Sequence, residues 1–213
     1  MNYLVFDCVL NKTFITLVKD VEFINKVIES DSENYHSVYL ISEIKNILEE
    51  NSLSLKELDF IGVDVGPASF TGIRVGLCVA KIISSEANLP CVPTPSVEIL
   101  SKINGLEEAV FLDARRGSFI FYKPNGEPLL IKKEEALEVA KEINCGIVAD
   151  SSASKYFKEN EIYATNYEEG MPEIGKILAE ISYKKFISNN KEVFNPRNIK
   201  PLYIQTPPVF SKN

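Results

Sequence analysis

Asp7 is a carboxylate within an otherwise apolar run, residues 3–10, whose composition predicts a β-strand. An unpaired charge is costly to bury, so a carboxylate there needs a hydrogen-bonding partner or a functional purpose. We favour the structural interpretation, in which Asp7 lies near the strand end and caps a neighbouring turn.

Histidine and cysteine offer little further chemistry. His36 is the only histidine, and none of the four cysteines is in a C-x-x-C pair. A thiol nucleophile works with a nearby base, usually histidine, so this composition disfavours a thiol enzyme. We expect Cys8 and Cys78 to pack as small, reduced hydrophobic residues. The sequence therefore predicts no catalytic residue.

A turn with a glycine joins a predicted strand, residues 58–65, to a predicted helix, residues 71–85. Ser69 or Thr71 can cap this helix, since a hydroxyl accepts a free amide N–H. A strand, a turn and a helix N-terminus also form an anion site, so phosphate near these two residues is the alternative. The P-loop pattern requires Lys-Ser/Thr after its last glycine, whereas Gly72 is followed by Ile73 and Arg74. The pattern therefore favours packing over phosphate binding.

The predicted helix carries a stripe of small residues at every fourth position: Gly72, Gly76, Ala80 and Ser84. Each helical glycine costs about 1 kcal/mol relative to alanine, so two on one face indicate close approach by another backbone. Most of the remaining surface is apolar, and a helix that is apolar nearly all round must be buried on two sides. We expect one side to face its own sheet and the other to face a second helix or a second chain.

Composition limits the classes of partner. The chain has 213 residues, 45% of them hydrophobic and 25% charged, with a net charge of −7. A protein that grips tRNA by its phosphates usually has a basic face, so strong direct tRNA binding is not expected. No apolar run is long enough to cross a membrane, and the N-terminus lacks the features of a signal peptide. We expect a cytoplasmic protein that does not enter membranes.

Strands and helices alternate along the chain, which predicts an α/β fold. A hairpin opens each half, at residues 3–18 and 109–122, while residues 22–28 fit either a strand or a short helix. Residues 31–50 predict a helix with a wide apolar stripe. A change in composition near residues 103–105 divides the chain into a first lobe, 1–103, and a smaller second lobe with a tail, 104–213.

Three segments resemble the TsaB (YeaZ) family. GPASFTGIRVGLCVAK, residues 66–81, resembles its GPGSFTGIRVG-type signature, with Ala68 where the family usually has glycine. LDARRGSFIFY, residues 112–122, resembles a second family segment, with Ser118 where glutamate is common. PLYIQ, residues 201–205, resembles the terminal segment, with Gln205 in place of arginine. The resemblance spans the chain but is specific only in these segments.

This resemblance implies a fold and a role. The fold is that of the two-lobed actin-like ATPases (ASKHA, or ribonuclease H-like), here with a reduced second lobe. The implied role is that of a non-catalytic partner of TsaD, the subunit that transfers a threonylcarbamoyl group to the tRNA adenosine next to the anticodon. The implied assemblies are a homodimer, a heterodimer with TsaD, and contact with the TsaE ATPase.

The resemblance also bears on ligands. In the actin-like superfamily, an aspartate on the first strand faces nucleotide phosphates and is followed by small or hydroxyl residues. Asp7 is instead followed by Cys8-Val9-Leu10. We therefore expect that this chain alone binds no cofactor. Binding of ATP or ADP at a partner interface stays open as an alternative, with Asp7, Ser69 and Thr71 near the nucleotide. The catalytic paralogue holds a metal with two histidines four residues apart, but Leu40 follows His36, so no metal is expected.

In the family, two helices of the first lobe pack against their counterparts in the partner. We expect the partner interface to be made by these residues: His36, Leu40, Ile44, Ile47, Gly72, Ile73, Gly76, Leu77 and Ala80.

Two other classes remain open. An enzyme of the same superfamily would be a nucleotide-binding phosphotransferase or a glycoprotease-like hydrolase; the single histidine and the absence of H-E-x-x-H disfavour the hydrolase. A tRNA-binding module is disfavoured by the acidic balance of the chain.

Overall fold

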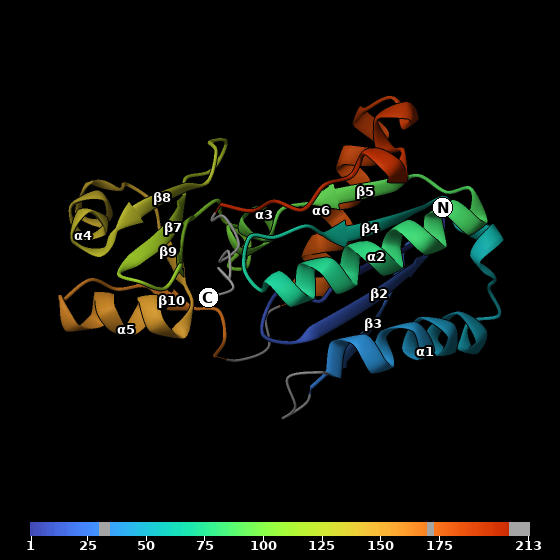
Figure 1. The fold of residues 1–213 in the computed structure, drawn as a ribbon, viewed down its shortest axis with the longest axis horizontal. Helices are drawn as coiled ribbons and strands as arrows, with labels where there is room; N and C mark the ends of the chain where they lie inside the picture. The colour runs from blue at the N-terminus through green and yellow to red at the C-terminus, as the bar shows by residue number, and fades with distance from the viewer. Residues whose placement is uncertain (30–34, 170–172, 205–213) are drawn as a thin grey trace, which may run out of the picture. The chain divides into compact units, whose positions relative to one another are not determined.

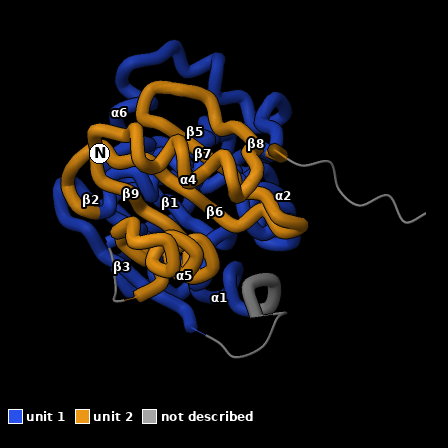
Figure 2. Tube along the Cα trace, turned by 90° about the vertical axis from the view of Figure 1, so that its left-hand side faces the viewer, with its two compact units in different colours: residues 1–103, 171–202 blue, residues 104–170, 203–213 orange. Residues whose placement is uncertain are grey.

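The computed structural model describes residues 1–29, 35–169 and 173–204, with side chains of the first helix described from Tyr39 onward. The chain forms two compact units (Figure 2). Unit 1 comprises residues 1–103 and 171–202, and unit 2 comprises residues 104–170 and 203–213. The lobe predicted at residues 104–213 is therefore too long, because residues 171–202 belong to unit 1. Each unit has its own five-stranded sheet.

The sheet of unit 1 is mixed, with the strand order β3-β2-β1-β4-β5 (Figure 1). Its strands are β1 Tyr3–Asp7, β2 Thr13–Lys19, β3 Glu22–Ile28, β4 Phe60–Asp64 and β5 Cys91–Thr94. The first three strands are antiparallel, and β4 and β5 run parallel to β1. The hairpin predicted at the start of the chain is confirmed, and residues 22–28 are a strand rather than a helix.

Two layers of helices cover this sheet. The consecutive residues Gly62 and Val63 of β4 point to opposite faces. A Cβ atom at Gly62 would meet Ser182 of α6 (Ile174–Ser188), whereas Val63 approaches Gly76 of α2 (Phe70–Ala87). The helix α1 (Tyr35–Glu50) contacts α2 and also packs on β2. Hence α1 and α2 share one face, and α6 covers the other (Figure 1).

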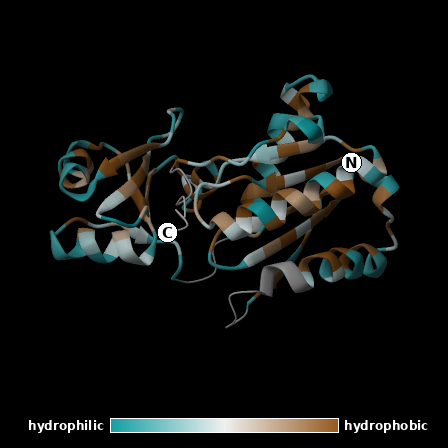
Figure 3. Cartoon of the chain, viewed as in Figure 1, coloured by the Kyte–Doolittle hydropathy of each residue, from teal (hydrophilic) through white to brown (hydrophobic). Residues whose placement is uncertain are grey.

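Short elements complete unit 1. They are the helix α3 (Ser96–Leu100) and the 3₁₀ helices η1 (Leu55–Glu57), η2 (Lys191–Phe194) and η3 (Pro196–Asn198). Hydrophobic residues are concentrated in the strands of the sheet, whereas α2 carries hydrophobic and hydrophilic residues along its length (Figure 3). None of the helices in the described part of the chain could span a membrane.

Unit 2 has the strand order β10-β9-β6-β7-β8. Its elements are β6 Ala109–Asp113, β7 Ser118–Tyr122, β8 Leu129–Lys132, α4 Lys133–Glu142, β9 Ile147–Ala149, α5 Ser151–Glu159 and β10 Thr165–Asn166. The second predicted hairpin is confirmed as β6 and β7. Its core is built around three fully buried aromatic rings, those of Phe111, Phe119 and Phe157.

Candidate functional site

Two carboxyl groups lie side by side at the end of neighbouring strands. Asp7 ends β1 and Asp64 ends β4, and these strands pair in parallel with Phe6 opposite Val63. Both side chains are fully buried. The carboxyl end of parallel strands is where open α/β sheets usually bind ligands, so this pair is the first place to look for chemistry.

Local backbone and hydroxyl groups use most of the oxygen atoms of the pair. Asp7 Oδ1 accepts the N–H of Val9 at 2.6 Å and that of Leu10 at 3.4 Å. Asp64 Oδ1 accepts the N–H of Gly66 at 2.7 Å, and the Ser96 hydroxyl donates to both Asp64 oxygens. The predicted capping role of Asp7 is therefore what the described structure contains, and Asp64 caps the next turn in the same way.

The remaining oxygen atom of the pair, Asp7 Oδ2, indicates that the two carboxyl groups share a proton. Asp7 Oδ2 is buried and has no ordinary hydrogen-bond donor within the described residues. Asp64 ends the strand beside Asp7, and its raised pKa favours a protonated carboxyl group that can donate to Asp7. Burial raises the pKa of Asp7 to about 6, against the lowering effect of the Val9 and Leu10 N–H groups. Burial, and then the charge of Asp7, raise the pKa of Asp64 well above its usual range.

The N-terminus of α2 closes directly on the turn that follows β1. A Cβ atom at Gly72 would overlap with the carbonyl group of Cys8, so the two backbones are in contact. The N–H of Ser69 donates to the Val9 carbonyl group at 3.4 Å. The Ser69 hydroxyl accepts the N–H of Gly72 at 3.1 Å, which settles the helix cap in favour of Ser69 over Thr71.

These contacts use N–H groups that could otherwise bind a phosphate. Its natural donors here would be the N–H groups of Val9, Leu10 and Gly72, and each is already bonded within the chain. These three N–H groups are therefore not available to a phosphate in this conformation. The described residues also contain no cluster of three or more histidine, cysteine, aspartate or glutamate side chains that could hold a metal.

The residues predicted to form the partner interface lie inside unit 1. On α1 these are Leu40, Ile44 and Ile47, all buried. The buried set on α2 is Gly72, Ile73, Gly76, Leu77 and Ala80. These buried residues pack within the chain because the small-residue stripe brings α2 close to its own sheet, so the partner interface itself stays a prediction. His36 belongs to α1, but its side chain lies outside the described residues, as does Gln205.

The side chains on the outward faces of α1 and α2 are not those predicted to form the partner interface. On α1, Tyr39 and Ile41 are exposed, Ile41 by 61%. On α2, Cys78 is exposed and Ile82 is exposed by 56%. Cys78 and Ile82 are four residues apart, so they lie on one face of the helix. The apolar composition of these helices was recognisable in the sequence, but the sequence alone did not assign each face.

Sequence reasoning also missed Asp64 and Ser96. A signal existed for Asp64, since it is a carboxylate at the end of an apolar strand, as Asp7 is. Ser96 carried no such signal, because only the fold brings it from the start of α3 to the Asp64 carboxylate.

The two five-stranded sheets, the helix layers and the paired aspartates define an α/β protein of the actin-like ATPase class. Over residues 23–191 the chain matches the family model described as "TsaD: tRNA N6-adenosine threonylcarbamoyltransferase". The chain belongs to this family, and its similarity to TsaB (YeaZ) proteins places it on that branch.

Two relatives illustrate the similarity. The chain is 33% identical over 118 residues to "tRNA threonylcarbamoyladenosine biosynthesis protein TsaB" of Buchnera aphidicola subsp. Baizongia pistaciae (strain Bp), which covers 52% of this chain and 53% of the relative. It is 33% identical over 86 residues to TsaB of Bacillus subtilis (strain 168), which covers 38% of this chain and 37% of the relative. The matched regions thus span about half of the first relative and less of the second.

Solved structures confirm the fold. "YeaZ from Pseudomonas aeruginosa" superposes with a TM-score of 0.72 at 15% identity and covers 95% of this chain and 99% of that chain. A second structure, of a P. aeruginosa protein described as similar to peptidase YEAZ, gives a TM-score of 0.75 at 14% identity and covers 96% and 99%. The predicted α/β fold of the actin-like ATPase type is therefore correct.

Proposed function

We propose that this chain is a non-catalytic partner of TsaD in the formation of threonylcarbamoyladenosine on tRNA. The names of its relatives supply the pathway, and the family match over residues 23–191 supports the assignment. In this role the chain activates or stabilises the subunit that transfers the threonylcarbamoyl group, and it acts in the cytoplasm.

The observation that carries the non-catalytic role is the closed turn at the end of β1. Its N–H groups bond to Asp7, and Gly72 lies against the carbonyl group of Cys8. An enzyme that used this end of the sheet would need donors free to bind substrate or nucleotide. Here the Asp7 and Asp64 pair instead joins two turns of the chain's own backbone, which suits a structural subunit.

The proposed contact surface is the outward face of α1 and α2, in place of the buried residues named from the sequence. Exposed apolar side chains on this face, Ile41 and Ile82, favour burial against another protein. The proposed occupants are a second copy of the chain when it is alone and TsaD in the heterodimer, with TsaE joining the complex. ATP or ADP, if present, would bind at the shared interface.

Sedimentation velocity tests this arrangement. The purified chain is run alone, and then with TsaD of the same organism at equal concentration. The proposal expects a dimer alone and a 1:1 heterodimer in the mixture. A chain that remains monomeric in both runs contradicts the proposed partnership.

A further inference from the structure

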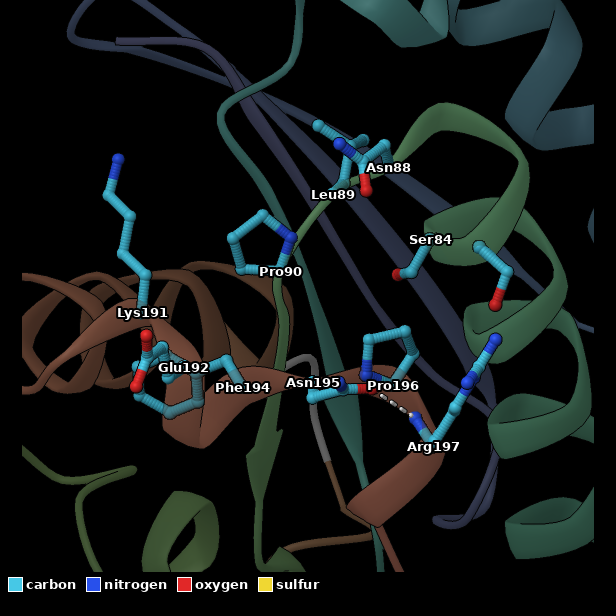
Figure 4. Close-up of a pocket in the computed structure, with 11 residues that line it drawn as sticks. Ser84, Asn88, Leu89, Pro90, Lys191, Glu192, Phe194, Asn195, Pro196 and Arg197 are labelled. Atoms are coloured by element: carbon cyan, nitrogen blue, oxygen red, sulfur yellow. Dashed lines mark hydrogen bonds between the residues drawn. The ribbon is translucent and has the colours of Figure 1, made fainter.

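A cavity of about 630 Å³ lies in unit 1, away from the Asp7 and Asp64 pair (Figure 4). Its walls come from the C-terminal end of α2, from the connection into β5, and from η2 and η3. Its size falls within the range of roughly 300–1,000 Å³ that is typical of small-molecule sites. The contacts between α2 and η3, and between β5 and η2, fix these walls within one unit.

One wall of the cavity carries hydrogen-bond donors. Ser84 and Ser85 contribute hydroxyl groups from α2, and Arg197 contributes a guanidinium group from η3. Asn195 Oδ1 accepts the backbone N–H of Arg197 at 3.0 Å, which leaves the amide nitrogen of Asn195 as a further donor (Figure 4). The side chain of Arg197 extends toward α2 in the same view. Convergent donors of this kind suit an oxyanion.

Two of these donors lack the partners that a purely structural role would provide. The guanidinium group of Arg197 forms no ion pair or side-chain hydrogen bond with any described residue. Ser84 is only 1% exposed, and its hydroxyl group lacks a hydrogen-bond partner in the described chain, apart from the weakly polar thiol of Cys91. In Figure 4 this hydroxyl points toward the other lining residues. A buried hydroxyl without a partner is costly, and a ligand oxygen would satisfy it.

The rest of the lining is apolar or charged. Leu89, Pro90, Phe194 and Pro196 provide a surface for a hydrophobic body. The charged lining side chains are Lys191, Arg197 and Glu192, so the lining is net positive in a chain whose net charge is −7. The Lys191 ammonium group lies 5.2 Å from the centre of the Phe186 ring, which leaves Arg197 as the cation beside the serines. The combination favours a negatively charged ligand.

We infer that this cavity binds a small organic anion, with a carboxylate or phosphate group held by Arg197 and the Ser84 and Ser85 hydroxyls, and an apolar body on Pro90, Phe194 and Pro196. A planar guanidinium group can hold either anion through two parallel hydrogen bonds. This site is independent of the proposed role with TsaD, because neither its residues nor its test involves that partner.

The test uses phenyl phosphate and benzoate as probes, which share an apolar ring and differ in the anion. Each is titrated into the ¹⁵N-labelled full chain, with neutral benzamide as the control ligand. The expected result is saturable shifts at residues 84–90 and 191–197 with at least one anion and none with benzamide. Stronger binding of one probe identifies the anion. Shifts that never saturate with either anion, or equal binding of benzamide, overturn the proposal.

Variants locate the binding site. Arg197→Gln should weaken the binding of the anion at least about tenfold, since it removes a charge-assisted hydrogen-bond pair. Ser84→Ala should weaken it by a smaller factor while the chain stays folded, because alanine fits a buried helical site. The matched control is Arg116→Gln, an exposed arginine of unit 2, which should bind as the parent chain does. If Arg197→Gln and Ser84→Ala both bind like the parent, the assigned residues do not form the site.

Discussion

Gly72 of α2 lies directly against the carbonyl group of Cys8, in the turn that follows β1. This contact brings the N-terminus of α2 onto the same turn whose N–H groups donate hydrogen bonds to Asp7. The end of the sheet is therefore occupied by the chain's own backbone. In the actin-like class this is the end where a ligand would be expected. The contact at Gly72 therefore stabilises the fold and also occupies the place of a ligand.

The two helical glycines should respond differently to alanine. At Gly76 an added Cβ atom would lie 3.6 Å from Val63 Cγ2 and 3.9 Å from Cys8 Cβ, which are ordinary contacts. Gly76→Ala should therefore raise the free energy of unfolding by up to about 1 kcal/mol, through helix propensity. Gly72→Ala should lower it by several times that amount, since backbone must move to admit the new atom. Chemical denaturation of both variants measures the difference, and equal effects would refute the contact.

The carboxyl pair predicts how stability changes with pH. The folded chain holds protons on Asp7 and Asp64 at pH values where an unfolded aspartate, with a pKa near 3.9, has lost them. The free energy of unfolding from this pair should therefore be greatest below about pH 4 and fall as pH rises through 6, the pKa of Asp7. The slope is about 1.4 kcal/mol per pH unit for each proton.

Asp64→Asn isolates this effect. An amide nitrogen can donate to Asp7 Oδ2 as the protonated carboxyl group does, and it does not titrate. Relative to the parent chain, the variant should gain stability steadily as pH rises from 4 to 7. The control is Glu86→Gln, an exposed carboxylate of α2, whose stability should follow the parent at every pH. A constant difference between Asp64→Asn and the parent would mean that the pair shares no proton.

The proposed partner surface is tested by two isoleucines of equal exposure. Ile82 on α2 and Ile187 on α6 are each 56% exposed, but they lie on opposite helix layers of unit 1. Ile82→Asp should weaken association with TsaD at least about tenfold, because it places a charge in a buried apolar contact. Ile187→Asp should leave it unchanged. Equal loss in both variants, measured by sedimentation, would move the interface away from α1 and α2.

Nucleotide binding by the isolated chain should be absent. The donors around Asp7 are used within the chain, so ATP with magnesium should leave its melting temperature unchanged. A ligand present at 100 times its dissociation constant would add about 2.7 kcal/mol to the free energy of unfolding, a shift that thermal melting detects easily. A clear rise in melting temperature would favour the phosphotransferase alternative and require the turn to open.

The sequence predicted most elements because their patterns are local. The opening hairpin, the strand before residue 66, the helix capped by Ser69 and the hairpin at β6 and β7 all depend on nearby residues. The short strands β8 and β10, at Leu129–Lys132 and Thr165–Asn166, were not predicted at these positions. Such short edge strands are defined by pairing with distant residues rather than by their own pattern.

Tertiary placement was harder to predict. Gly72 indicated close backbone approach correctly, but its partner is the turn after the chain's own β1, whereas Gly76 makes only ordinary contacts with side chains. Residues 171–202 return to unit 1 because α6 packs on all five strands of the first sheet, which composition does not reveal. Asp64 could have been found from its apolar strand, whereas the bond from Ser96 depends on the fold alone.

The central claim is that this chain supports TsaD and does not perform the reaction itself. The most direct test measures threonylcarbamoyladenosine on tRNA with this chain alone, with TsaD of the same organism alone, and with both, with TsaE present throughout. The account predicts no product from this chain alone and a large gain when it is added to TsaD. Product formed by this chain without TsaD, or no gain on its addition, would contradict the account.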